Sequence, residues 1–268
     1  MNSQPELESV SSSTPVVKQP QRHGKVFVFF NSLYHWFLCS FYFFPVCTFL
    51  VVFSIFVDPR KSDPAQRMLC RYTTRLAGAR VESRSAPGFD PSRTYLFIVN
   101  HVSLFDPFVL YVAIPQYIRG LELESHFRIP AYGWMMKRFG NIPVPLENRL
   151  SDLKRMWRMA RSALDAGVSL VVFAEGQRTM TGRIGEFKDG AFRMALQFGC
   201  PIVPVSVVGS FEFNNKLSLA LRPGTIVVHI HEPIETVNLS KDDAPALRDR
   251  VRAIMAKTID EYYESGRI

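Results

Sequence analysis

The sequence predicts an α/β fold, a layered mixed sheet with flanking helices, preceded by an N-terminal membrane-embedded helical hairpin. Two observations predict the layered domain. Short apolar runs rich in β-branched residues, at 94–99, 168–173, 202–208 and 225–230, have the composition of buried strands. Segments with helical spacing alternate with these runs, as is typical of α/β layers. A third observation, a long uncharged segment near the N-terminus, predicts the hairpin.

The chain divides into three predicted parts. Residues 1–24 are polar and rich in Ser, Pro and Gln, which predicts a disordered tail. Residues 25–62 form a membrane-associated helical segment, and residues 63–268 form a catalytic domain. With 47% hydrophobic residues, the chain has enough apolar side chains for a sizeable core.

The apolar segment from Val26 to Val57 contains 32 residues and no Asp, Glu, Lys or Arg. A straight helix of that length would run about 48 Å, whereas the hydrocarbon core of a bilayer is about 30 Å thick. Pro45, near the middle, can break a helix. Basic residues flank both ends, so they indicate no orientation. A re-entrant or shallow hairpin explains the length, the proline and the charges together; one tilted crossing is the alternative.

The net charge of +8 indicates an anionic partner, which could be nucleic acid, anionic lipid or a phosphorylated substrate. No nucleic-acid motif is present, and a nucleic-acid binder would leave the apolar segment unexplained. The four cysteines form no CxxC pair, so neither a zinc site nor a disulfide framework is indicated. Reduced thiols favour a catalytic domain on the cytoplasmic face of a membrane.

Helical patterns fill the spaces between the predicted strands. The segment "SDLKRMWRMARSALDAG" has apolar residues at helical spacing between a capping Ser151 and a terminating Gly167. Two further helices follow in "DGAFRMALQFG" and "PALRDRVRAIMAKTIDEYYES". From Tyr117 to Arg161 there are nine Lys and Arg against four Asp and Glu. This excess predicts binding of anionic headgroups or of a carrier's phosphates, unless it is only a solvated helix face.

The stretch "NHVSLFDPF" places His101 and Asp106 five residues apart. On one continuous helix the two side chains would diverge by about 140°. Asp106 followed by Pro107 instead fits an N-cap and the first helical position. His101 then lies in the loop after the strand 94–99, where a fold in the loop can join it to Asp106. The alternative is that Asp106 only caps a helix and His101 only lies on a loop.

A second motif, "FAEGQRT", directly follows the predicted strand 168–173. Its glycine, Gly176, allows a ligand close to the backbone, and Arg178 suits bidentate contact with phosphate. The alternative is a turn in which Glu175 and Arg178 form an ordinary surface salt bridge. Further on, "GEFKDGAF" supplies Lys188 between two glycines, and Pro204 within an apolar run predicts an edge or bulged strand.

Together these stretches resemble the glycerolipid acyltransferases of the 1-acylglycerol-3-phosphate O-acyltransferase type, over roughly residues 65 to 230. The family's first block, Asn-His-four residues-Asp, is matched by Asn100, His101 and Asp106. Its Phe-Pro-Glu-Gly-Thr-Arg-Ser block is similar to residues 173–179, with Ala174 and Gln177 as departures. The Phe-Lys-x-Gly that follows, and the later Val-Pro-Val, look like Phe187, Lys188 and Gly190 and like residues 203–205.

One departure leaves the acceptor open. In the block "GNIPVPLENR" the family has an arginine, associated with the acceptor's phosphate, about where Leu146 stands. The nearest arginine is Arg149. Either Arg149 or Arg178 holds the phosphate, or the acceptor is not a simple lysophosphatidate.

The resemblance implies an enzyme that moves a fatty acyl chain from a thioester, either acyl-CoA or acyl carrier protein, to a lysophospholipid hydroxyl. His101 would be the general base, and Asp106 would orient its imidazole. The substrate-binding residues would be Asn100, Glu175, Gly176, Arg178, Arg149 and Lys188. We expect no metal and no cofactor beyond the donor. The alternatives are a phospholipid transacylase, an enzyme for another lysolipid, and a membrane-binding adaptor with a degenerate site, which the intact His101 and Asp106 disfavour.

Overall fold

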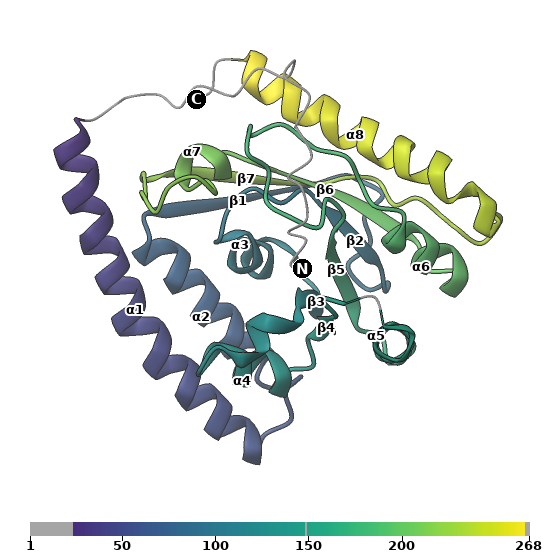
Figure 1. Cartoon of the computed structure of the whole chain (residues 1–268), viewed down its shortest axis with the longest axis horizontal. Coiled ribbons are helices and arrows are strands. Elements are labelled where there is room, and N and C mark those ends of the chain that lie inside the picture. The colour runs from purple at the N-terminus through teal and green to yellow at the C-terminus, as the bar shows by residue number, and fades with distance from the viewer. Residues whose placement is uncertain (1–23, 148, 266–268) are drawn as a thin grey trace, which may run out of the picture.

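A seven-stranded mixed sheet forms the centre of the domain (Figure 1). The computed structural model describes residues 24–147 and 149–265. Its strands are β1 (Ala79–Ser85), β2 (Leu96–Val99), β3 (Ile118–Leu123), β4 (Ile142–Val144), β5 (Ser169–Phe173), β6 (Ile202–Val208) and β7 (Gly224–Ile230), in the order β1-β7-β6-β2-β5-β3-β4. The neighbours β6 and β7 are antiparallel, and the other neighbouring strands pair in parallel. The predicted α/β class is confirmed.

Helices cover both faces of the sheet (Figure 1). They are α1 (Lys25–Phe56), α2 (Asp63–Leu76), α3 (Asp106–Ala113), α4 (Tyr132–Arg138), α5 (Leu150–Asp165), α6 (Gly190–Phe198), α7 (Ser210–Phe213) and α8 (Ala244–Glu264), with short 3₁₀ turns at Glu124–Arg128 and Lys241–Asp243. Side chains alternate along each strand. Phe97 and Val99 of β2 therefore join the core cluster beneath α3, whereas Leu96 and Ile98 join the cluster beneath α6 and α8.

The strands that the sequence predicted are all present, and three more are added. The predicted runs became β2, β5, β6 and β7, with ends within two residues of those expected. The unpredicted strands β1, β3 and β4 include both edges of the sheet. The proposed disordered tail lies outside the described residues, apart from Gly24. The division into three parts stays a prediction.

Pro204 lies in the interior of the sheet, so the expectation of an edge strand is wrong. Its strand β6 runs between β2 and β7. The antiparallel pairing pairs Val205 with Ile230, and the next bridge joins Ile202 to Ile234. The extra residue on the partner segment is a bulge next to the proline. Pro204 has no N–H to donate and joins its neighbour only as an acceptor, since its carbonyl accepts from His231 N (3.0 Å).

The apolar segment forms one continuous helix, α1, with Pro45 inside it. The predicted reversal near Pro45 is therefore wrong: the chain turns back only after Phe56, and α2 then runs antiparallel against α1. Near the far end of α2, the carbonyl of Leu76 lies 2.5 Å from His35 Nδ1. A proline removes one hydrogen bond from a helix. Packing on both sides of it, through Cys39 and Leu50, holds the remaining turns in line.

Helix α1 exposes its large apolar residues and buries several small or polar ones, which is the reverse of an ordinary surface helix. Its buried residues are Ser32, Cys39, Phe43, Cys47, Leu50 and Ser54, so the side toward the domain carries several small and polar groups. The outward side exposes large apolar residues along its whole length, from Val26 (71% exposed) to Phe56 (83%). By length and composition α1 could cross a membrane. Helix α1 packs along the domain against α2 and α4, so its exposed apolar side faces away from the domain (Figure 1).

Two adjacent residues test these opposite faces of α1. Leu50 is buried with Leu69 and Met135, whereas Phe49 is 62% exposed. We expect Leu50→Ala to lower the free energy of unfolding in detergent by about 2–5 kcal/mol. Phe49→Ala should change it by less than about 0.5 kcal/mol and should instead weaken binding to phosphatidylcholine vesicles. Equal destabilisation by the two variants would contradict this assignment of faces.

Candidate active site

The loop after β2 brings His101 and Asp106 together. His101 Nδ1 lies 2.9 Å from Asp106 Oδ2, so the predicted pair is present. Asp106 is fully buried, and the side chain of His101 is 20% exposed. With Nδ1 engaged by the carboxylate, the other ring nitrogen, Nε2, is left to accept a proton. The ring is also held from one side, because it stacks on Phe173 at the end of β5, with 4.0 Å between ring centroids.

The Asp106 carboxylate accepts hydrogen bonds from several groups of the loop and does not cap a helix. Oδ2 also accepts from Val102 N (2.6 Å) and Ser103 N (2.8 Å), and Oδ1 accepts from Ser210 Oγ (2.7 Å). The predicted N-cap role is wrong, because α3 already begins at Asp106 and Phe105 takes the N-cap position. The carboxylate turns back to the amides that precede the helix, and this fixes the loop that carries His101.

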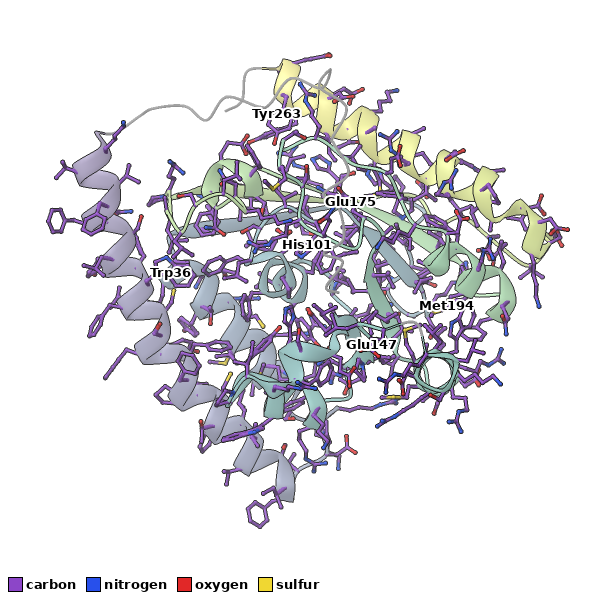
Figure 2. The ribbon with its side chains drawn as sticks, viewed as in Figure 1. Trp36, His101, Glu147, Glu175, Met194 and Tyr263 are labelled. Carbon is purple, nitrogen blue, oxygen red and sulfur yellow. The ribbon has the colours of Figure 1, made fainter. Side chains whose placement is uncertain are left out.

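A second buried carboxylate, Glu175, lies beside His101 (Figure 2). Its Oε1 accepts from His101 N (3.0 Å), and its Oε2 accepts from Gly185 N (3.0 Å). Burial raises the pKa of Glu175 from 4.5 to about 7, although both amide donors act to lower it. Glu175 therefore joins the loop that carries His101 to the loop that carries Gly185. The substrate contact that the resemblance implied stays a prediction.

The loop from residue 174 to 188 is fastened at several points. Thr179 N donates to the carbonyl of His101 (2.8 Å), which places this loop directly beside the dyad. Arg252 of α8 donates from Nε to the carbonyl of Gly185 (2.7 Å). Arg183 forms an ion pair with Asp260, also on α8. The last helix of the chain thus supports the loop from behind.

Two cations of this loop are available to a ligand. Lys188 is exposed and its side chain lies across Gly176, since a Cβ at Gly176 would be 2.9 Å from Lys188 Nζ. Gly176 has φ +72, which also favours glycine. Arg178 is half-buried, and its positive charge opposes the rise in the pKa of His126 that the hydrogen bond with Glu122 causes. Within the part of the chain that the structure describes, Arg178 has no ion-pair partner.

The remaining predicted site residues have other positions. Asn100 is 2% exposed and bonds through both amide atoms to the backbone of Val207, at 2.8 and 3.0 Å. It holds the ends of β2 and β6 together, and the expected substrate contact stays a prediction. Arg149 precedes α5 and pairs with Glu147 at 2.7 Å, with a side chain 70% exposed. It is not joined to the His101 loop by any contact among the described residues.

Ser210 and Phe173 are site residues that the sequence interpretation did not assign. Ser210 follows β6, which runs parallel to β2, so both strands end at the same edge of the sheet. A signal for it was present, because a serine two residues after the predicted strand 202–208 lies at the same end of the sheet as His101. Phe173 was recognised only as part of a motif. Among residues 24–147 and 149–265, no group of three or more His, Cys, Asp or Glu could hold a metal ion.

Comparison with known proteins shows the family to which the chain belongs. A family model described as Acyltransferase matches residues 80–208. The chain is 30% identical over 201 residues to 1-acyl-sn-glycerol-3-phosphate acyltransferase alpha of Ovis aries, which covers 75% of this chain and 70% of that protein. The chain belongs to the acyltransferase family. This acyltransferase is also 30% identical to the protein of the same name from Homo sapiens. That match covers 75% of this chain and 71% of the relative.

A solved structure shares the fold of this acyltransferase. It is the 1-acyl-sn-glycerophosphate (LPA) acyltransferase PlsC from Thermotoga maritima, which superposes with a TM-score of 0.75 at 23% sequence identity. The match covers 88% of this chain and 96% of the other. The likeness includes most of the chain, so the sheet and its surrounding helices form a shared architecture.

The raised pKa of Glu175 predicts a specific pH dependence of stability. Because the folded-state pKa, about 7, exceeds the ordinary 4.5, the folded protein retains a proton that the unfolded chain releases. This contribution to stability is full below the lower value and is lost as pH rises through the higher one. Glu175→Gln should remove it, up to about 3 kcal/mol, in urea unfolding compared at about pH 5 and about pH 8.

A neighbouring glutamate is the control for that measurement. Glu186 is exposed on the same loop, so Glu186→Gln should keep the wild-type pH dependence. A Glu175→Gln variant whose stability falls with pH as steeply as the wild type's would refute the assignment.

Proposed function

We propose that this acyltransferase transfers a fatty acyl chain from a thioester, either acyl-CoA or acyl carrier protein, to the free hydroxyl of lysophosphatidate. The His101–Asp106 pair, at 2.9 Å, carries the proposal. A thioester is already activated, and a hydroxyl is a poor nucleophile at neutral pH. The site therefore needs a base, and an imidazole held by a carboxylate is suited to that role.

His101 Nε2 removes the proton from the acceptor hydroxyl as the oxygen attacks the thioester carbonyl. A new C–O bond forms, the C–S bond breaks, and the proton passes from the imidazolium to the departing thiolate. Asp106 stabilises the positive ring while it exists. The fixed loop and the Phe173 contact keep the ring in one orientation, which reduces the reorganisation that the step requires.

Transfer is direct in this proposal, without an acyl-enzyme. Ser103 is fully buried and its hydroxyl is engaged with Asn214 Oδ1 (3.2 Å) and Phe105 N (3.1 Å). All four cysteines are buried and unpaired. Burial raises the pKa of Cys200 to about 12, which disfavours a thiolate nucleophile. The nucleophile is then the substrate's own oxygen.

The acceptor's phosphate is assigned to Arg178 and not to Arg149. Arg149 is exposed and already paired with Glu147, whereas Arg178 is half-buried beside the dyad loop and unpaired within the described chain. Lys188 adds a second positive charge in that loop. Lysophosphatidate as the acceptor is supported by the names of the relatives, which are 1-acyl-sn-glycerol-3-phosphate acyltransferases.

The outward apolar side of α1 supports attachment to a membrane, with the domain resting on one leaflet. Side chains from Val26 to Phe56 on that side are exposed apolar groups without protein cover, and an interfacial helix of this kind buries its apolar side at the headgroup boundary. The cytoplasmic leaflet is favoured by the buried, reduced cysteines and by the net charge of +8, since that leaflet carries anionic lipids.

Loss of the base should abolish transfer. We expect His101→Ala to lower turnover by about 10²–10⁴-fold, and Asp106→Asn to lower it by about 10²-fold or more because the amide cannot stabilise the imidazolium. Thiol release from acyl-CoA with lysophosphatidate measures both. The pair His126–Glu122, at 3.0 Å, provides a matched control, since His126→Ala should retain near wild-type turnover. Full activity of His101→Ala would eliminate the proposal.

Substitution of Arg178 and of Arg149 should have different effects on the affinity for the acceptor. We expect Arg178→Ala to raise KM for lysophosphatidate by about tenfold or more, because a charge-assisted hydrogen bond is lost. Arg149→Ala should change it by less than about twofold, as for an exposed ion pair. With monoacylglycerol as acceptor the two variants should behave alike. The reverse order of effects on lysophosphatidate would assign the phosphate to Arg149.

A further inference from the structure

A cavity of about 640 Å³ lies at the amino ends of the parallel strands, whereas His101 and Asp106 lie beyond their carboxyl ends. Its lining includes Tyr117 and Arg119 at the start of β3 and Val168 just before β5. The dyad, by contrast, follows the carboxyl ends of β2 and β5. Because β2, β3 and β5 are parallel, the two sites are at opposite ends of the same strands, and the cavity is no part of the catalytic loop cluster.

The cavity is strongly basic. Its charged lining residues are Asp58, Arg60, Arg119, Arg138, Arg155 and Arg158, which is five positive charges against one negative. The Asp58 carboxylate is engaged locally, since it accepts from Arg60 N at 2.7 Å. Outside the lining, Asp63 lies 3.8 Å from Arg119 but is shared with Arg67, at 2.7 Å. The guanidinium groups of the cavity therefore keep an excess of positive charge and repel each other, so the arrangement favours an anionic ligand.

Three of the arginines are held by the protein, which makes the cavity a built site. Arg119 is 2% exposed, stacks on Tyr117 at 3.8 Å and bonds Tyr111 OH at 2.8 Å, while its Nε has no hydrogen-bond partner among the described residues. Arg138 donates from Nε to Ser54 Oγ (3.1 Å). Arg60 donates to the carbonyl of Ala166.

The other two arginines are unengaged. Arg155 and Arg158 are exposed on α5, three residues apart, and therefore project from one side of that helix. Neither forms a hydrogen bond or ion pair with any residue between 24 and 147 or between 149 and 265. Ser162, one turn further on, lines the cavity with them. These groups can reorient onto a ligand without breaking a contact within the protein.

The position of the cavity identifies the ligand's source. Its lining begins with Asp58, two residues after α1 ends at Phe56. The outward side of α1 is apolar up to that residue, which is 83% exposed. If that side lies in the bilayer, the cavity lies where the apolar layer meets the headgroups. Guanidinium groups bind phosphate oxygens in bidentate fashion.

We propose that this arginine cavity binds the phosphate of an anionic phospholipid headgroup, as a second phosphate site separate from the acceptor's. The cavity then holds the amino ends of strands β3, β4 and β5 near the membrane surface. Helix α1 attaches the adjacent side of the domain to the same membrane. The inference rests on the proposed membrane attachment of α1 and is independent of the chemistry at His101.

The test compares two double variants of the full-length protein that remove the same charge from the same helix. Arg155→Ala with Arg158→Ala empties the cavity of its unengaged arginines. Lys154→Ala with Arg161→Ala removes two charges of α5 that do not line it. Co-sedimentation is measured with phosphatidylcholine vesicles, with and without phosphatidylglycerol. Phosphatidylglycerol should increase the vesicle affinity of the wild type. We expect this increase to be at least about tenfold smaller in the cavity variant and to change much less in the control variant.

Equal losses in the two variants would mean only a diffuse basic surface and would overturn the proposal. Inorganic phosphate distinguishes a soluble ligand. If phosphate raises Tm of the wild type in detergent but not of the cavity variant, while both bind vesicles equally, the ligand is soluble and the lipid assignment fails. Ser162→Glu, which adds a carboxylate to the cavity, is a second variant and should reduce vesicle binding similarly. Turnover on detergent-dispersed lysophosphatidate should persist in the cavity variant, so failure here is distinguishable from failure of the proposed reaction.

Discussion

The buried carboxylate of Asp106 is the contact on which the site depends. It is fully buried yet accepts four hydrogen bonds, from the imidazole, two loop amides and the hydroxyl of Ser210. A carboxylate so placed would be costly without those donors. The donors come from the loop after β2 and from Ser210, two residues after β6, so one side chain fixes the loop of His101 to the ends of two strands. The geometry of His101 is a consequence of that arrangement.

Glu175 performs a related task with a different electrostatic result. It accepts two hydrogen bonds, from the amides of His101 and Gly185 in two loops, where Asp106 accepts four, and burial raises its pKa to about 7. Both carboxylates are buried. The cations Arg178 and Lys188, on the same loop as Glu175, are half-buried and exposed. These accessible charges are positive, which suits an anionic acceptor.

The central strands and the His101–Asp106 pair could be predicted from the sequence. Elements whose residues form no continuous apolar run could not. The interior strands β2, β5 and β6 are buried on both faces, so their runs are continuous and apolar. The edge strand β1, "ARVESRS", is largely exposed and carries charges, so no such run exists. Helix α2 was missed because its buried side includes polar residues such as Gln66 and Thr73.

The site residues divide in the same way. The spacing of His101 and Asp106 and the following proline predicted a loop that could join the two side chains, and the resemblance to the acyltransferases implied their roles. The roles of Asn100 and Glu175 were not predicted, because whether a polar side chain faces a ligand or the backbone of another strand depends on tertiary contacts. The turn at Pro45 was expected from local helix chemistry, and long-range packing against α2 overrode it.

The docking of α1 along the domain also determines how substrate reaches the enzyme. Trp36 of α1 lies against Phe105, with 5.6 Å between ring centroids, and Phe105 immediately precedes Asp106. The helix that would enter the bilayer is thus one side chain away from the catalytic loop. With α1 in a leaflet, a lysolipid would approach by lateral diffusion and would not need to leave the membrane. The rate would then follow the mole fraction of lysolipid in the surface, and inert lipid would slow the enzyme by dilution in two dimensions.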